Sequence, residues 1–307
     1  MPRLTENKII IITRKTRLDD VVVKFNTIDQ ARFYVENLGA DFSDYQKEDQ
    51  TYKRAVATIE ADLQKLARVQ LIDRAYVPNF IFTKNDIIVV IGQDGLVANT
   101  LKYLDSQPVI AINPDPARWD GVLLPFMVAD ARSIVMELLS KKRGHKEISF
   151  AKIQTNNGQV LYGVNDIFIG PKSHTSARYM LEIDNKKEQQ SSSGIIISTG
   201  LGSTGWLSSI VAGANGISGQ KLLEPYQGFD WAADYLYYSV REPFPSNVTG
   251  TTLIFGKIRK NNKMKITSMM AENGVIFSDG VEADFIEFNS GTAASISVAD
   301  KKGYLVI

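Results

Sequence analysis

A carboxylate between two glycines is the residue of this chain best placed for chemistry. Gly92-Gln93-Asp94-Gly95 follows DIIVVI (86–91), a short apolar run typical of a buried strand. Glycines let a ligand approach the backbone, and a helix N-terminus after the turn favours phosphate. Asp94 can accept a proton from a substrate hydroxyl, or it can cap the helix that follows. Both interpretations stay open at this point.

A second polar loop follows the next predicted strand, PVIAIN at 108–113. In INPDPARWDGVLLP (112–125), Asn113, Asp115 and Asp120 belong to residue types that commonly form turns. The loops that follow the strands of an open parallel sheet share one edge, where ligands bind. We therefore expect Asn113 and Asp115 to face the same crevice as 92–95.

Asn165-Asp166 lies inside the apolar segment YGVNDIFIG (162–170), an unusual place for a carboxylate. A hairpin turn would explain it, and recognition of the vicinal hydroxyls of a ribose is the functional alternative. Asp279-Gly280, in SDGVEADFIEFNSG, favours a type I′ hairpin turn.

The segment GIIISTGLGSTGWLSS (194–209) is a strand that enters a glycine-rich loop. Its hydroxyls can donate to phosphate or ribose, its glycines permit close approach, and Trp206 offers a ring for stacking on a base. The loop lacks the lysine and spacing of a Walker motif, and GLGSTG does not fit G-x-S-x-G. The candidate residues here are Thr199, Gly202, Ser203, Thr204, Gly205 and Trp206.

The elements that must position these residues change in kind along the chain. Strands are predicted at 9–13, 86–91 and 108–113, and helices at 29–38, 46–77, 96–104 and 128–140, while 21–28 begins a helix or an extended segment. This alternation predicts an α/β domain with a mainly parallel sheet over 1–143. Short strands dominate 144–307, which predicts a β-sandwich-like domain, interrupted by one helix after STGLGSTGW. The charged segment KKRGHKE (141–147) is the predicted linker.

Composition excludes several classes of site. The chain has 307 residues, no cysteine and two histidines, so thiolate metal sites, cysteine nucleophiles and disulfides are excluded, and no metal-ligating residue is predicted. A formal net charge of +1 gives no sign of a nucleic-acid partner. No apolar run approaches the roughly 18 residues of a membrane span, so we expect a soluble, cytoplasmic protein without a membrane partner.

The order of these motifs resembles that of the NAD kinase family over most of the chain. That family has G-G-D-G, Asn-Glu/Asp and T-x-x-G-S-T-type motifs, which here are GQDG, ND and STGLGSTGW. Further details look like the mitochondrial-type branch: TRKTRLDD, INPDPARWDG, SSSG, Trp206, SVREP and FIEFNSG.

The resemblance implies phosphorylation of the NAD 2′-hydroxyl to give NADP, with ATP or polyphosphate as donor and Mg²⁺ alongside. Asp94 would be the general base or hydroxyl-orienting carboxylate, Gly92 and Gly95 would make room for phosphates, and Asn165 and Asp166 would bind the NAD ribose or adenine. Thr204, Gly205 and Trp206 would line the dinucleotide site. The family also suggests a homodimer or homotetramer built through the β domain.

Four residues depart from the family pattern: Gln93, Leu96, Ala111 and Trp119 stand where glycine, threonine, glycine and serine are usual. Gln93 adds a side chain where a phosphate would approach and loses the freedom of glycine to adopt φ > 0. The alternative to a kinase is therefore a dinucleotide-binding protein on the same fold that is non-catalytic or has altered specificity. A lipid or sugar kinase of the wider superfamily fits the ND and GSTGW elements less well.

Overall fold

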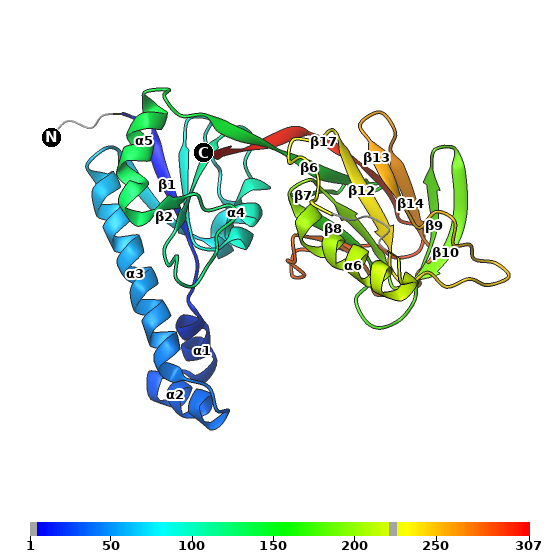
Figure 1. Ribbon diagram of the computed structural model, residues 1–307, viewed down its shortest axis with the longest axis horizontal. Helices are drawn as coiled ribbons and strands as arrows, with labels where there is room; N and C mark the ends of the chain where they lie inside the picture. The colour runs from blue at the N-terminus through cyan, green and yellow to red at the C-terminus, as the bar shows by residue number, and fades with distance from the viewer. Residues whose placement is uncertain (1–4, 221–225) are drawn as a thin grey trace. The chain divides into compact units, whose positions relative to one another are not determined.

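A computed structural model describes residues 5–220 and 226–307, which belong to two units (Figure 1). Unit 1 extends to Lys146 and also contains Tyr304–Ile307, and unit 2 is Glu147–Gly303. The predicted division into 1–143 and 144–307 did not include the return of the last four residues to unit 1. No helix in the described ranges is long and apolar enough to cross a membrane.

Unit 1 is built on a parallel sheet. Its strands are β1 (Lys8–Thr13), β2 (Arg68–Asp73), β3 (Ile87–Ile91), β4 (Pro108–Asn113) and the short β5 (Phe126–Met127). The order is β4-β3-β1-β2, and every neighbouring pair is parallel. β4 also pairs with β5 at its carboxyl end and with the last residues of β17 (Ala293–Val306) at its amino end. The predicted α/β fold of this half is confirmed.

Helices cover this sheet and extend beyond it. α3 (Phe42–Gln64) and α5 (Ala131–Leu139) pack on one face, through a core that includes Ile59, Leu63 and Ile134. α4 (Asp94–Leu101) starts directly after β3. α1 (Arg17–Phe25) and α2 (Ile28–Asn37) pack with the start of α3 as a separate cluster (Figure 1). Single turns of 3-10 helix occupy Arg74–Asn79 and Val128–Asp130.

The predicted helix over 46–77 was wrong in its second half. α3 ends at Gln64, and Arg68–Asp73 forms β2 at the edge of the sheet, in register with β1 from Lys8↔Arg68 to Thr13↔Asp73. The apolar spacing of RVQLID fits a helix and a strand equally well, and pairing with β1 decides the outcome. The uncertain segment 21–28 is helical through Phe25, because Thr16 and Asp19 form a capping box at the start of α1.

Unit 2 is a sandwich of two antiparallel sheets, as predicted. The six-stranded sheet has the order β13-β12-β11-β8-β15-β16. These strands are β8 (Asp166–Pro171), β11 (Ile195–Ser198), β12 (Tyr235–Val240), β13 (Phe255–Arg259), β15 (Gly274–Ser278) and β16 (Ile286–Glu287). The facing strands are β6 (His145–Thr155), β7 (Val160–Gly163), β9 (Ala177–Ile183), β10 (Lys186–Ser192), β14 (Met264–Ser268) and β17.

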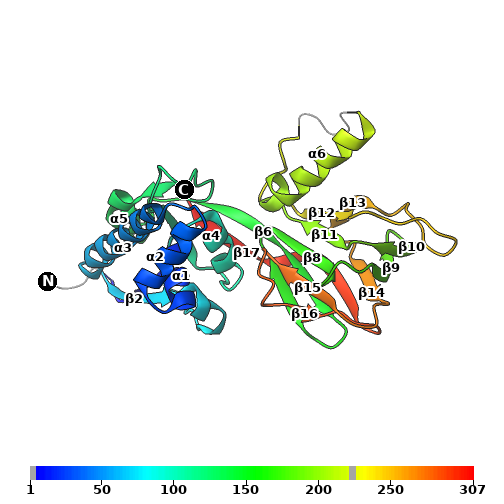
Figure 2. The same cartoon turned by 90° about the horizontal axis from the view of Figure 1, so that it is seen from below.

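The core of the sandwich lies between its two sheets and includes Ile167, Tyr179, Ile197 and Ile266. The predicted helix is α6 (Trp206–Ser218), preceded by a 3-10 turn at Gly202–Thr204. α6 packs on the outer face of the six-stranded sheet, against Phe168 and Ile196 (Figure 2). β10 was not predicted, because KKEQQSS is polar and gains its order from antiparallel pairing with β9.

Candidate functional site

The GQDG turn is held against the loop that follows β4. The Gly92 N–H donates to the Ile112 carbonyl at 3.3 Å, and Asp94 is the first residue of α4. The Asp94 carboxylate does not cap its own helix. Its two oxygens accept from the backbone N–H groups of Leu123 at 2.8 Å and Val122 at 3.2 Å. The two loops expected to share a crevice in this half of the chain are therefore joined through Asp94.

The loop after β4 is shaped by its own polar residues. Buried Asn113 donates from Nδ2 to the Trp119 carbonyl at 2.9 Å, and its Oδ1 accepts from the Asp115 N–H at 3.1 Å. The Asp115 carboxylate lies 3.5 Å from the Arg118 guanidinium. Asn113 and Asp115 thus form the turn that their residue types favour, and both polar atoms of the Asn113 side chain make hydrogen bonds within it.

Gln93 causes no backbone strain. Its φ of −107° and ψ of 163° are extended, so a positive φ is not needed and the loss of glycine's freedom has no effect here. A Cβ on Gly92 would lie 2.8 Å from Leu96 Cδ2, so Gly92 makes room for Leu96. The space around Gly95 is open, with no atom within 4 Å of a Cβ placed there. Ala111 is fully buried in β4, and Trp119 is half-buried in the loop.

In unit 2, a turn from another part of the chain holds Asn165-Asp166. The Asp279 carboxylate accepts from the backbone N–H groups of Val164 at 2.9 Å and Asn165 at 2.7 Å, with a longer contact to Asp166. Asp279 and Gly280 have φ of 54° and 70°, which confirms the predicted turn. Asn165-Asp166 is not itself a hairpin turn, because the strands on either side, β7 and β8, belong to different sheets and do not pair.

The glycine-rich loop packs directly on Asn165. Thr199 Oγ1 donates to the Val164 carbonyl at 2.5 Å, and a Cβ on Gly202 would overlap the Asn165 carbonyl. Ser203 Oγ donates to the Gly200 carbonyl at 2.6 Å. Thr199 and Ser203 are fully buried, so their hydroxyls hold the loop together and are not available as ligand donors. Gly202 likewise serves close backbone packing, which corrects the expectation that it makes room for a ligand.

Thr204 and Gly205 are exposed, and Trp206 is half-buried at the start of α6. The Trp206 ring stacks on Phe168, with centroids 6.1 Å apart and planes inclined by 11°. The candidate residues of unit 2 that remain accessible are therefore Asn165, Asp166, Thr204, Gly205 and Trp206.

Asp166 is the most perturbed carboxyl group of these candidates. Burial, and then the negative charge of Asp279, raises the pKa of Asp166 to about 7. Within the described residues its carboxyl group receives no hydrogen bond, although its backbone is held by Asp279. The neighbouring Asn165 amide has no hydrogen-bond partner within residues 5–220 and 226–307, and a half-buried carboxyl with a raised pKa beside such an amide is a typical feature of a binding site.

An ion-pair ladder at the carboxyl edge of the unit 1 sheet was not predicted. Its arginines are Arg14, Arg17 and Arg118, and its acids are Asp44 and Glu48 of α3. Arg14 pairs with Glu48 at 2.9 Å, Arg17 bridges Glu48 and Asp44, and Arg118 forks onto Asp44. The i, i+4 spacing of Asp44 and Glu48 was the only signal in the sequence, and their partners are 27 or more residues distant.

No group of three or more His, Asp or Glu side chains that could hold a metal ion occurs within 5–220 and 226–307. Mg²⁺ is commonly bound through one or two carboxylates together with substrate phosphates. Asp94 fits such a limited role, whereas a cage made of protein ligands alone does not fit the residues present.

Comparison with solved structures identifies the class of fold as the two-domain NAD kinase-like fold. One similar structure is an NAD kinase from Archaeoglobus fulgidus in complex with ATP, with a TM-score of 0.57 and 17% identity over 97% of this chain and 92% of that one. Another is yeast NADH kinase complexed with NADH, with a TM-score of 0.61 and 14% identity over 98% and 84%. No protein-family model and no curated protein sequence matches the chain.

Proposed function

We propose that this protein is an NAD kinase-like phosphotransferase that uses ATP to phosphorylate the 2′-hydroxyl of NAD. The observation that carries the proposal is that the motifs contact one another in two pairs. Asp94 of GQDG binds the loop after β4, and Thr199 and Gly202 of the glycine-rich loop pack against Asn165-Asp166. The shared fold with kinases whose structures contain ATP or NADH supports it.

Asp94 would orient the reacting hydroxyl. Each of its oxygens accepts one backbone N–H, which fixes the carboxylate while leaving lone pairs for a substrate hydroxyl. The 2′-oxygen forms a bond to the γ-phosphorus as the bond from that phosphorus to the ADP oxygen breaks, and the hydroxyl proton passes late in the step to the Asp94 carboxylate. A positioned carboxylate is sufficient for this step, because orientation contributes more than base strength.

The phosphates would lie at the start of α4. The first amide groups of a helix have no intrahelical acceptor and carry the positive end of the helix dipole. Gly95 leaves open space beside them. Mg²⁺, when bound with the triphosphate, supplies charge neutralisation during transfer. Asn165 and Asp166 would hold ribose hydroxyls, and Thr204, Gly205 and Trp206 would line the dinucleotide site.

The remaining parts of the proposal concern the state of the protein in the cell. We propose small-molecule nucleotides as its partners, a homodimer or homotetramer as its assembly, and the cytoplasm as its location. Membership of the mitochondrial-type branch stays a prediction that rests on sequence motifs alone.

One observation favours the alternative of a non-catalytic dinucleotide-binding protein. Both Asp94 oxygens are engaged by the loop at Val122 and Leu123, which is also what a purely structural aspartate would do. Gln93 at the N-cap position makes no capping bond, so its side chain is free to extend toward the space where phosphate would lie.

A turnover assay with Asp94→Asn tests the proposal. Purified protein with ATP, Mg²⁺ and NAD should form NADP. The variant should lose at least about a hundredfold in turnover while retaining NAD binding, since the carboxylate acts mainly in the transition state. Asp120→Asn is the matched control, because Asp120 is an exposed acid of the neighbouring loop.

If wild-type protein forms no NADP but NAD raises its melting temperature, the binding-protein alternative is correct. Gln93→Gly gives a further check. Higher activity in that variant would show that the glutamine side chain obstructs the phosphate site.

A further inference from the structure

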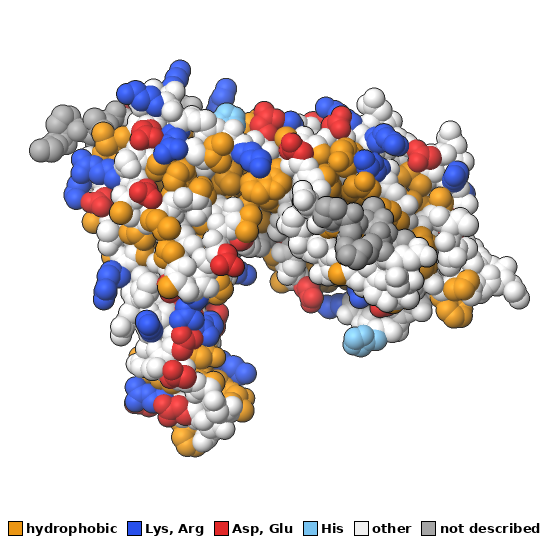
Figure 3. Space-filling view, viewed as in Figure 1, with side chains coloured by type: hydrophobic (Ala, Val, Ile, Leu, Met, Phe, Trp, Pro, Cys, Tyr) orange, Lys and Arg blue, Asp and Glu red, His pale blue; other side chains and the backbone are white. Residues whose placement is uncertain are grey.

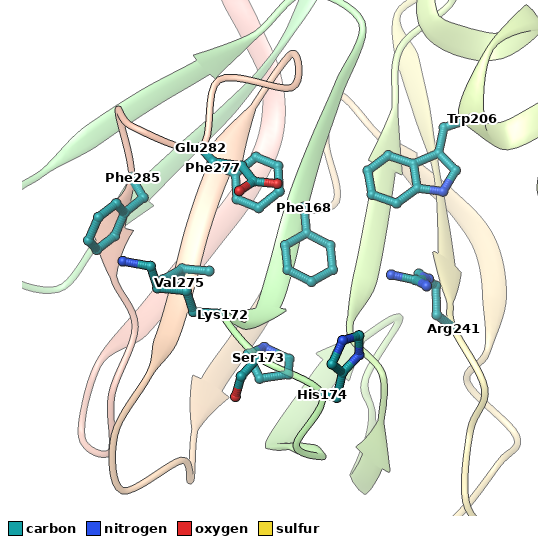
Figure 4. A pocket seen from close by; sticks show the side chains of 11 residues that line it. Phe168, Lys172, Ser173, His174, Trp206, Arg241, Val275, Phe277, Glu282 and Phe285 are labelled. Carbon is teal, nitrogen blue, oxygen red and sulfur yellow. The ribbon is translucent and has the colours of Figure 1, made fainter. Parts of the chain in front are cut away.

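A pocket of about 310 Å³ lies within unit 2, on the outer face of the six-stranded sheet (Figure 4). Its aromatic lining comes from Phe168 of β8, Phe277 of β15, Trp206 of α6 and Phe285 of the loop between β15 and β16. The Phe168 ring lies 5.0 Å from Phe277 and 6.1 Å from Trp206, nearly parallel to the latter. These rings make a surface on which a planar ligand ring can stack.

Positive side chains border this aromatic surface. Lys172 Nζ lies 4.8 Å from the Phe285 ring centroid, and the Arg241 guanidinium lies 5.6 Å from that of Trp206. Neither cation has a carboxylate partner among the described residues. Figure 4 shows His174 on the Arg241 side of Phe168 and Lys172 on the Phe285 side. Glu282 is the acid in the lining, so the lining carries a formal charge of about +1 with His174 neutral.

The pocket extends away from the candidate dinucleotide site. Asp166 begins β8 and Lys172 follows its end, a separation of roughly 20 Å at the usual rise per residue. Asp166 and Phe168 point to the same face of the sheet, and Trp206 lines this pocket as well as the candidate dinucleotide site. Pockets for whole ligands range from roughly 300 to 1,000 Å³, and a volume of about 310 Å³ at the lower end of that range suits a single ring system with a charged group.

We propose that this pocket binds a mononucleotide, with the base on the aromatic side chains and the phosphate on the side of Arg241 and His174. A phosphate monoester brings close to two negative charges and strong acceptor oxygens, which suits a site whose cations lack carboxylate partners. Cation–π contacts with Phe285 and Trp206 hold Lys172 and Arg241 at the edge of the rings.

Calorimetric titration with AMP, adenosine and inorganic phosphate tests the proposal on the intact chain. AMP should bind at least about tenfold more tightly than adenosine or phosphate, since only AMP offers both ring and charge. Arg241→Gln should weaken AMP binding about tenfold and leave adenosine binding within about twofold, and Lys172→Gln, on the Phe285 side, should have a smaller effect on AMP binding. Arg241→Lys, which keeps the charge, should recover part of the loss, and circular dichroism should confirm folding of each variant.

Two controls separate this site from others. Lys265→Gln removes one positive charge from an exposed position on the opposite sheet and should leave AMP affinity unchanged. Asp166→Ala should also leave it unchanged if AMP occupies the pocket. AMP affinity that falls in Asp166→Ala, or that is insensitive to Arg241→Gln and Lys172→Gln, would overturn the proposal. None of these readouts depends on NADP formation, so the kinase proposal and this one can fail separately.

Discussion

The carboxyl groups of Asp166, the first residue of β8, and of Asp279, which binds the backbone there, lie in very different environments. Asp279 accepts hydrogen bonds from consecutive backbone N–H groups at Val164, Asn165 and Asp166. The Asp166 carboxyl lies close to it, is half-buried, and has its pKa raised to about 7 by burial and then by the charge of Asp279. The charge of Asp279 thus orders the loop and at the same time discourages a second charge beside it.

This raised pKa makes a stability prediction for Asp166→Asn. The folded-state pKa of about 7 exceeds the ordinary aspartate value of 3.8, so the native state binds more protons between these values and loses stability as pH rises toward 7. A neutral amide avoids that loss. The free energy of unfolding of the variant, relative to wild type, should therefore increase from pH 5 to pH 8, as measured by urea denaturation.

Asp300→Asn is the control, because Asp300 is an exposed acid on β17, and its effect should be the same at both pH values. An Asp166→Asn difference that does not change with pH would contradict the perturbed ionisation of Asp166.

At the scale of elements, the ion-pair ladder joins the start of α3 to two loops at the carboxyl edge of the unit 1 sheet. Glu48 is 3% exposed and accepts from Arg14 and Arg17. Burial opposes ionisation of Glu48, but the hydrogen bonds from Arg17 and Arg14 outweigh it and lower its pKa. Tyr52, one turn further along α3, accepts from the Arg14 N–H and donates to the Ile91 carbonyl, each at 2.9 Å. α3 thereby positions the ends of β1 and β3.

Glu48→Gln should destabilise the protein by about 3 kcal/mol, because it leaves the nearly buried Arg14 without its charge partner. Asp62→Asn on the same helix should have a far smaller effect than Glu48→Gln, since the pair of Asp62 with Lys65 is exposed and screened by solvent. Chemical denaturation at pH 7 measures both. The contribution of Glu48 should diminish as pH falls below the ordinary pKa of a glutamate and through the lowered pKa of the folded state. Equal effects of the two variants would refute the structural role of the ladder.

At the scale of the whole molecule, β17 carries the chain from unit 2 back into unit 1. Tyr304 and Leu305 pair with Pro108 and Val109 of β4, and Leu305 is 1% exposed.

Leu305→Ala should lower the free energy of unfolding by about 2–5 kcal/mol through the cavity it leaves. Amide hydrogen exchange should become faster in β3 and β4 and remain unchanged in β9 and β10. Ile307→Ala, at a residue 52% exposed, is the control and should change neither. Faster exchange in β9 as well would contradict the expectation that the loss of the Leu305 side chain destabilises unit 1 alone.

Sequence patterns predicted the elements whose order is local. Alternation of apolar strands and amphipathic helices predicted the parallel sheet, and dense short strands predicted the sandwich. The errors occurred where pairing decides: β2 was assigned to a helix, and β10 was missed because its residues are polar. At the site, the order of the strands indicated that the loops after β3 and β4 lie together, and the hydrogen bonds of Asp94 join them. Residue types did not indicate that Thr199, Ser203 and Gly202 are buried against neighbouring backbone, because burial depends on which distant segment packs on the loop.

The sequence by itself determined the fold class and the positions of the polar loops, because apolar periodicity and turn residues act over a few neighbouring positions. Only the tertiary structure decided what each polar residue does. Asp94 was ambiguous between a helix cap and a substrate ligand, and its hydrogen bonds go to a loop 28 residues further along. Asp279 was predicted as a turn residue and also holds Asn165-Asp166 from more than a hundred positions away. Such partners are set by packing of distant segments, which no local pattern encodes.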